Sequence, residues 1–232
     1  MESVNIDIIL PTCGRVEDLE ESIYSLSTNM SNGCNCRYIF LLEENDTPTI
    51  DFCKNTGKNS IIVLNTEHLP LAKLFSRGLK ECSSKYVFFW NDDIFMLSSE
   101  WDIELVNTLK TCDFAGLKLT RRGSKTDFSP HTVFGIPYAL IGGTTLSFLE
   151  EFGFLDFQYN LWYADPDFGL RMLVAGKIQR WMNILVYHKG GPPTPSYPVS
   201  ANVDEKLFYE KWSPRVKELQ EAYSKVKHLW LA

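Results

Sequence analysis

One unbroken run of β-branched and aromatic residues, Tyr86–Trp90, leads directly into the polar triplet Asn91-Asp92-Asp93. Because the run does not alternate between apolar and polar residues, it is typical of a strand covered on both faces. Such a strand seldom ends in adjacent carboxylates unless they bind a cation, and oxygen ligands suit Mg²⁺ or Mn²⁺. The triplet is also common turn chemistry, so a metal site and a simple loop are both open at this point.

Strand-like and helix-like segments alternate along the first half of the chain. Strands are predicted over Asn5–Leu10, Arg37–Leu42, Ser60–Leu64, Tyr86–Trp90 and Asp113–Leu119. Helices are predicted over Val16–Thr28, Leu69–Cys82 and Glu100–Leu109. This order predicts an α/β fold with a mixed, mainly parallel central sheet flanked by helices. Polar residues follow several of the strands, at the sheet edge where ligands bind in such folds.

The pattern becomes less regular after Leu119. Further elements are expected over Thr132–Ile136, Leu146–Phe152 and Ile178–Tyr187. The last of these strands delivers His188 at its end. Asp204–Leu229 predicts a long amphipathic helix, broken at Ser213-Pro214, that packs across the sheet as a C-terminal brace.

A second dense cluster of polar and aromatic residues precedes a predicted helix. Asp165 stands at an N-cap position, with Pro166 as the first helical residue, so capping would explain one acid. Capping does not explain Asp167, or the presence of Trp162 and Tyr163 beside both acids. The cluster is therefore a second candidate site.

Composition limits the class of protein. The 232 residues are 44% hydrophobic and 22% charged, which is typical of an ordinary globular protein. A net charge of −6 argues against a surface built for nucleic acid. One local basic run could be a solvated hairpin tip or a phosphate-binding patch, and it comprises Lys118, Arg121, Arg122 and Lys125.

We expect a cytoplasmic protein. No window approaches the roughly 18 apolar residues needed to span a bilayer, so no membrane span is expected. The N-terminal residues lack the basic and apolar regions of a signal peptide. The six cysteines are too few for a disulfide scaffold at this length, and we expect reduced thiols.

Together these motifs resemble those of the glycosyltransferases with the Rossmann-like GT-A fold, and within them family 2, which is inverting and nucleotide-sugar-dependent. The resembling segments are Ile8–Arg15, Leu42–Asp46, Leu79–Asp93, Glu151–Asp156, Asp165–Arg171, His188 and Phe208–Trp212. The resemblance implies a single GT-A domain over residues 1–232. Within it we expect a nucleotide-sugar-binding half at 1–119, an acceptor-side half at 120–190, and a Pro-rich loop with a helical brace at 191–232.

The resemblance also implies roles on the donor side of the site. The residues expected to bind the donor are Pro11, Thr12, Arg15, Glu43, Glu44, Lys73, Arg77, Asn91 and Asp92. A Mn²⁺ or Mg²⁺ ion is expected on Asp93 and His188. Glu43 or Glu44 would accept a hydrogen bond from uracil or guanine, so the donor is expected to be a UDP- or GDP-sugar.

On the acceptor side, the resemblance implies that Asp165 is the general base of an inverting transfer. Asp167 is the reserve base, or else it binds acceptor hydroxyls. Trp162 or Tyr163 would offer an apolar face to a sugar ring, and Arg171 completes the motif. The expected acceptor is a glycan, a glycoprotein or a small molecule, and less readily a modified nucleic acid.

Three positions depart from the family pattern. Asn91 replaces the first Asp of the DxD triplet, which moves the expected metal role onto Asp93. Phe75-Ser76 replaces an Arg-Asn pair, and Ala164 replaces a Glu, which puts more weight on Asp165.

Two other functions stay open at this point. A catalytically inactive module that binds nucleotide or glycan is compatible with Asn91. A nucleotidyltransferase of similar fold would need a Gly-rich, Lys-bearing phosphate loop, whereas Pro11–Arg15 has one glycine and no lysine.

Overall fold

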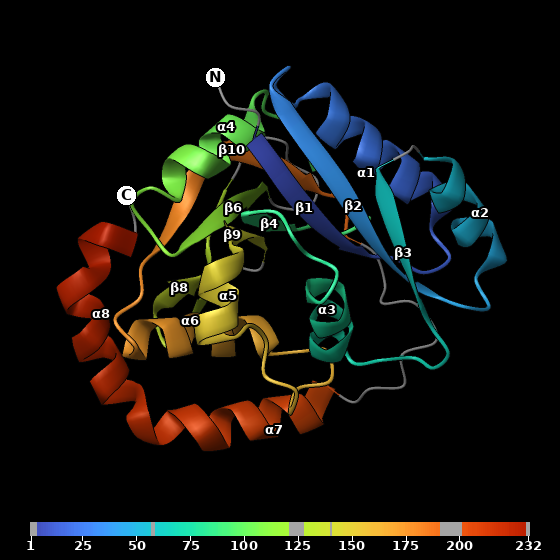
Figure 1. Ribbon diagram of the computed structural model, residues 1–232. Helices are drawn as coiled ribbons and strands as arrows, with labels where there is room; N and C mark the ends of the chain where they lie inside the picture. Colours follow the sequence, from blue (N-terminus) through green and yellow to red (C-terminus); the bar gives the residue numbers. More distant parts are fainter. Residues whose placement is uncertain (1–3, 57–58, 121–127, 140, 191–200, 231–232) are drawn as a thin grey trace.

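An eight-stranded, mostly parallel sheet forms the centre of the computed structural model (Figure 1). The structure describes residues 4–56, 59–120, 128–139, 141–190 and 201–230. The strand order is β3-β2-β1-β4-β9-β6-β10-β5. The strands are β1 Val4–Pro11, β2 Cys34–Glu43, β3 Ser60–Asn65, β4 Tyr86–Phe89, β5 Ile94–Met96, β6 Phe114–Thr120, β9 Gly142–Thr145 and β10 Gln179–His188.

Parallel pairing joins β3, β2, β1 and β4, and also joins β6 to β10. β9 lies antiparallel between β4 and β6, and β5 is antiparallel to β10. The helices are α1 Val16–Thr28, α2 Thr47–Asn55, α3 Leu71–Leu79, α4 Trp101–Thr108, α5 Leu146–Phe152, α6 Ala164–Val174, α7 Ala201–Trp212 and α8 Val216–Trp230. The predicted α/β class and GT-A-like sheet are confirmed.

Strand β4 shows why its sequence lacks alternation. Side chains of consecutive strand residues point to opposite faces of a sheet. Phe89 meets Phe75 of α3 edge-on with ring centroids 5.3 Å apart, whereas Phe88 stacks on Trp101 of α4 at 4.8 Å. Both phenylalanines are buried. The apolar run is therefore the sequence pattern of a strand with helices on both of its faces.

One strand prediction in the second half needed correction. The expected strand over Thr132–Ile136 is instead a hairpin of β7 (His131–Val133) and β8 (Ile136–Tyr138), which pair antiparallel. The chain reverses at Phe134 and Gly135, where φ is +53° and +76°.

Strand β9 was not predicted, because its Gly-Gly-Thr-Thr sequence has no strand-like side chains. Glycine is required there by close packing. A Cβ atom on Gly142 would lie 2.1 Å from the carbonyl oxygen of Ala115 in the neighbouring strand. The absent side chain therefore lets β9 fit between β4 and β6.

Helix α2 and the start of helix α6 also differ from expectation. Helix α2 was not predicted, although its signals are present: Asp46 accepts a hydrogen bond from the backbone N–H of Thr49, and a proline follows in the first turn. The N-cap assignment for Asp165 was wrong. Helix α6 begins at Ala164 after Tyr163, whose φ is +65°, so Asp165 lies inside the first turn.

The expected C-terminal helical extension is confirmed, including its break. A 3₁₀ turn over Ser213–Arg215 separates α7 from α8, because proline cannot continue the helical hydrogen bonding. Helix α8 packs against α6 and β10, and Figure 1 shows α7 along the bottom of the molecule and α8 along its left side. The Pro-rich loop lies outside the described residues, as do Arg121, Arg122 and Lys125. The division into donor and acceptor halves stays a prediction.

No helix in the described ranges is long and apolar enough to span a bilayer. All six cysteines are free thiols, as expected.

Candidate functional site

A cavity of about 390 Å³ opens at the carboxyl ends of β1, β2 and β4. It brings together residues that are far apart in the sequence. The predicted site residues that line it are Pro11, Thr12, Arg15, Glu43, Asn91, Asp92, Asp93, Trp162, Asp165 and His188. Those that do not line it are Glu44, Lys73, Arg77, Tyr163, Asp167 and Arg171. The two sequence clusters therefore meet in one cavity, although not with all their members.

Helix α1 holds the turn between β4 and β5 in place. The hydroxyl of Ser22 accepts a hydrogen bond from the indole N–H of Trp90 at 2.7 Å and donates to the carbonyl of Ile94 at 2.8 Å. Ser22 is fully buried. Both ends of the Asn91-Asp92-Asp93 turn are thus fixed to one side chain of α1.

Asp92 is held within the protein by one hydrogen bond and one ion pair. Its carboxylate accepts a hydrogen bond from the Thr12 hydroxyl at 2.6 Å, and its other oxygen lies 2.7 Å from Nη2 of Arg15 in an ion pair. The side chain is fully buried. Burial raises the pKa of Asp92 to about 6, against the lowering effects of the Arg15 charge and the Thr12 hydrogen bond. Asp92 therefore joins the loop after β1 to the turn.

Asp93 forms a separate pair with His188. Its carboxylate lies 3.3 Å from Nε2 of His188 and 3.8 Å from Nη1 of Arg15. Burial alone would raise the pKa of Asp93, but the hydrogen bond to His188 and the charges of His188 and Arg15 hold it below its ordinary value. The N–H of Lys189 donates to the carbonyl of Asp93, which aligns the end of β10 with the turn.

This pair has the chemistry of a partial divalent-metal site. Mg²⁺ and Mn²⁺ take few protein ligands and complete their shells with water and phosphate oxygens. Within the described residues, no group of three or more His, Cys, Asp or Glu side chains could hold a metal. A carboxylate and an imidazole facing a cavity fit an ion that keeps most of its ligands from water and substrate.

A second polar region lies at the ends of β2 and β3. Glu43 contacts Nδ1 of His68, and the Asn65 amide donates to the carbonyl of Leu42 at 2.9 Å. Arg77 donates to Oδ1 of Asn65 at 2.6 Å, so it supports the cavity wall without lining it. Asn65 and His68 were missed by sequence reasoning. The position of Asn65 after an apolar strand was the available signal.

Asp165 faces the cavity without a side-chain partner. None of the side chains that the structure places forms a hydrogen bond or ion pair with its carboxylate. The residue keeps part of its surface accessible through the cavity, yet burial among protein atoms raises its pKa to about 7, and its own backbone N–H only partly opposes this. A carboxylate with this pKa is chemically able to take up a proton near neutral pH.

Asp167, two residues later, has the opposite environment. It is fully buried and accepts hydrogen bonds from Nε of Arg171 at 2.8 Å and from the indole N–H of Trp212 at 2.8 Å. Nζ of Lys211 lies 2.7 Å away, and the Tyr159 hydroxyl donates at 3.2 Å. Asp167 therefore connects α6 to α7 and does not line the cavity.

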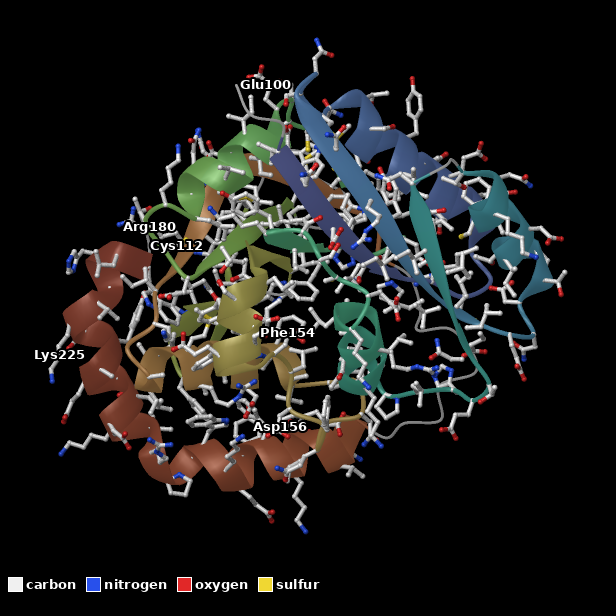
Figure 2. All side chains as sticks on the ribbon, viewed as in Figure 1. Glu100, Cys112, Phe154, Asp156, Arg180 and Lys225 are labelled. Carbon is white, nitrogen blue, oxygen red and sulfur yellow. The ribbon has the colours of Figure 1, made fainter. Side chains whose placement is uncertain are left out.

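The aromatic pair of the second cluster is also split. Trp162 lines the cavity with 43% of its surface exposed, whereas Tyr163 packs on Phe208 of α7 and donates to Glu205 at 3.1 Å. Phe154 forms another part of the cavity wall and stacks on Phe89 at 4.0 Å; Figure 2 labels it between α5 and α3. One face of the cavity is thus aromatic.

Comparison with known proteins agrees with this geometry. A family model described as "Glycosyl transferase family 2" matches residues 7–164. The match includes β1 from Asp7 onward and the β4–β5 turn, and it ends immediately before Asp165. A search of curated proteins gave no match.

Proposed function

Because the chain belongs to glycosyltransferase family 2, whose model covers well over half of it, we propose that it transfers a sugar from a UDP- or GDP-sugar to an acceptor hydroxyl with inversion. One observation carries the finer part of the proposal. The cavity contains both a carboxylate–imidazole pair, Asp93 and His188, and a carboxylate of raised pKa, Asp165, that forms no hydrogen bond or ion pair with any described side chain. A donor diphosphate and an acceptor hydroxyl need these two environments.

The donor nucleotide is proposed to lie along the ends of β1, β2 and β4. Glu43 and Asn65 line the cavity, and their side-chain oxygens would accept hydrogen bonds from base N–H groups. Asp93 and His188 would hold Mn²⁺ or Mg²⁺, which when bound neutralises charge on the leaving diphosphate. Arg15 is held by Asp92 beside the same place, so its guanidinium would face the phosphates from a fixed position.

Inversion requires the acceptor hydroxyl to attack the anomeric carbon from the face opposite the diphosphate. As the new carbon–oxygen bond forms, the bond to the diphosphate oxygen breaks and the hydroxyl proton passes to Asp165. A base with a pKa near the working pH is best suited to this transfer. Trp162 would offer its exposed ring to a sugar face, which favours a glycan, glycoprotein or small glycoside as acceptor.

The proposal is tested by a thermal-shift panel of UDP-, GDP- and dTDP-sugars with and without Mn²⁺, followed by a nucleotide-release assay. A ligand at 100 times its Kd stabilises the folded state by about 2.7 kcal/mol, which raises Tm by roughly 5–10 °C at this size. We expect this shift for one nucleotide class, larger with Mn²⁺, and slow release of nucleotide by hydrolysis.

No shift with any nucleotide sugar would contradict the proposal. A shift without any release of nucleotide would instead favour a catalytically inactive binding module, the function with which Asn91 in the DxD-like triplet is also compatible.

A further inference from the structure

Asp204, in the first turn of α7, is a fully buried carboxylate outside the cavity. It accepts hydrogen bonds from the backbone N–H groups of Asn160 at 3.1 Å, Leu161 at 2.9 Å and Trp162 at 3.0 Å. The side-chain amide of Asn160 adds a fourth donor at 3.0 Å. None of the cations placed by the structure forms an ion pair with it. Its charge is therefore balanced by one short loop.

Asp204 needs these hydrogen bonds, because burying a carboxylate without partners costs a large amount of free energy. Hydrogen bonds from several N–H groups to a charged acceptor are stronger than neutral ones. An acid in the first turn is also favoured by the helix dipole. Asp204 thus has a strong energetic requirement for these three consecutive amides, and they in turn are fixed to α7.

The loop that Asp204 holds leads directly into the proposed acceptor side. Leu161 and Trp162 line the cavity, and Tyr163 then turns the chain with φ +65° so that α6 begins and presents Asp165. The carbonyl of Asn160 accepts a hydrogen bond from the N–H of Leu71 at the start of α3. The loop is therefore anchored to two helices, one on each side.

We propose that Asp204 is a positioning residue for the transfer reaction: by holding the amides of residues 160–162, it sets the places of Trp162 and Asp165 in the cavity. The assignment of Asp165 as the proton acceptor rests on the proposed function. The hydrogen bonds between Asp204 and the loop do not depend on that assignment, so the two parts of the proposal can be tested separately.

The test compares Asp204→Asn with the wild type and with Glu210→Gln. The asparagine keeps the size of the side chain but turns one acceptor oxygen into a donor that faces backbone N–H groups. Glu210 is an exposed acid of the same helix whose only ion pair is with exposed Lys206 among the placed residues, so its variant is the matched control.

Two measurements are made on each protein. Amide hydrogen exchange at residues 160–162 is expected to accelerate about tenfold or more in Asp204→Asn, with β1 and β4 unchanged. Mn²⁺-dependent hydrolysis of the nucleotide sugar selected by thermal shift is expected to fall about 10- to 100-fold in kcat. Affinity for the free nucleoside diphosphate is expected to stay within about twofold of the wild-type value, because the residues proposed to contact it lie at the ends of β1, β2 and β4.

Unchanged exchange at residues 160–162 would overturn the hold on the loop. Faster exchange with unchanged kcat would overturn the positioning role. If Asp204→Asn does not fold, Asp204→Glu, which keeps a carboxylate one methylene further out, is tested by the same two measurements with a smaller expected loss. If the wild type hydrolyses no nucleotide sugar, the proposed function fails, and the exchange data alone decide whether Asp204 holds the loop.

Discussion

Two acidic pairs, Asp92 with Asp93 and Asp165 with Asp167, each contain one fully buried member and one more accessible member, and different parts of the chain hold them in place. In each pair one carboxylate is fully buried and neutralised, by Arg15 in one case and by Arg171 and Lys211 in the other. The other members, Asp93 and Asp165, line the cavity, as Asp92 also does, whereas Asp167 does not. Clustered acids in a sequence therefore need not share one role. One member can fix the backbone while its neighbour is available for chemistry.

The difference lies in what holds each pair. The Asp92–Asp93 turn is fixed mainly by groups in the first part of the chain, namely Thr12, Arg15 and Ser22. The end of β10 adds the contacts of His188 and Lys189 with Asp93. The Asp165–Asp167 segment is fixed from the C-terminal extension, through the contacts of Asp167 with α7 and through the hydrogen bonds that the preceding loop, residues 160–162, donates to Asp204. The donor side is thus held mainly by the loop after β1 and by α1, whereas the acceptor side depends on α7.

The largest expected effect tests the cavity-facing acid of the second pair. Asp165→Asn removes the proposed proton acceptor and is expected to lower the rate of sugar transfer or donor hydrolysis by about 10²- to 10⁴-fold. Nucleotide affinity should be nearly unchanged, measured by calorimetry. Asp51→Asn, on the exposed face of α2, is the control. Retained turnover in Asp165→Asn would end the assignment of this residue as the base.

The buried member of the same pair should act on stability. Asp167→Ala leaves Arg171 without an ion pair among the described residues, leaves Lys211 only its ion pair with Asp156, and removes the acceptor for two further hydrogen bonds. We expect a loss of about 2–3 kcal/mol in the free energy of unfolding, less than for a fully buried pair because both cations reach solvent. Urea denaturation measures it. A loss below that of a surface substitution such as Asp51→Ala would contradict the stabilising role.

On the donor side, the proposed metal role is tested by Asp93→Ala. Without the carboxylate, the Mn²⁺-dependent part of nucleotide affinity is expected to fall about tenfold. Calorimetry with and without Mn²⁺ gives both values. The Mn²⁺-independent part should change little, since Glu43 and Asn65 are untouched. Equal affinities with and without Mn²⁺ in the wild type would remove the reason to assign a metal to this pair.

A pH dependence of stability is also expected from Asp165. Its pKa is raised by burial to about 7, above the roughly 3.9 of an unfolded Asp. The folded state therefore binds more protons between about pH 4 and 7, and the contribution of Asp165 to stability falls as the pH rises through that window. Relative to the wild type, Asp165→Asn should gain Tm between pH 4 and 7 and stay level above it. A constant Tm difference would show that the pKa of Asp165 is not raised.

The fold class could be predicted from local sequence pattern. A strand covered on both faces is an unbroken apolar run, whereas a helix beside it has apolar residues at helical spacing. Tyr86–Trp90 was recognisable for this reason. Elements that depend on close packing were not recognisable: β9 exists because Gly142 allows a backbone approach that no side-chain pattern reports. The hairpin of β7 and β8 was hidden for a related reason, since Phe134 takes an uncommon positive φ.

For the site, the sequence by itself determined which residue types were available: acids after β4, acids beside Trp162, and a histidine at the end of β10. It could not assign their environments, because burial and ion pairing arise between segments distant in the chain. Only the tertiary structure separated Asp93 from Asp92 and Asp165 from Asp167, through contacts with Arg15, His188 and Lys211. It also revealed Asp204, whose importance comes from the three amides that fold against it and not from its sequence neighbours.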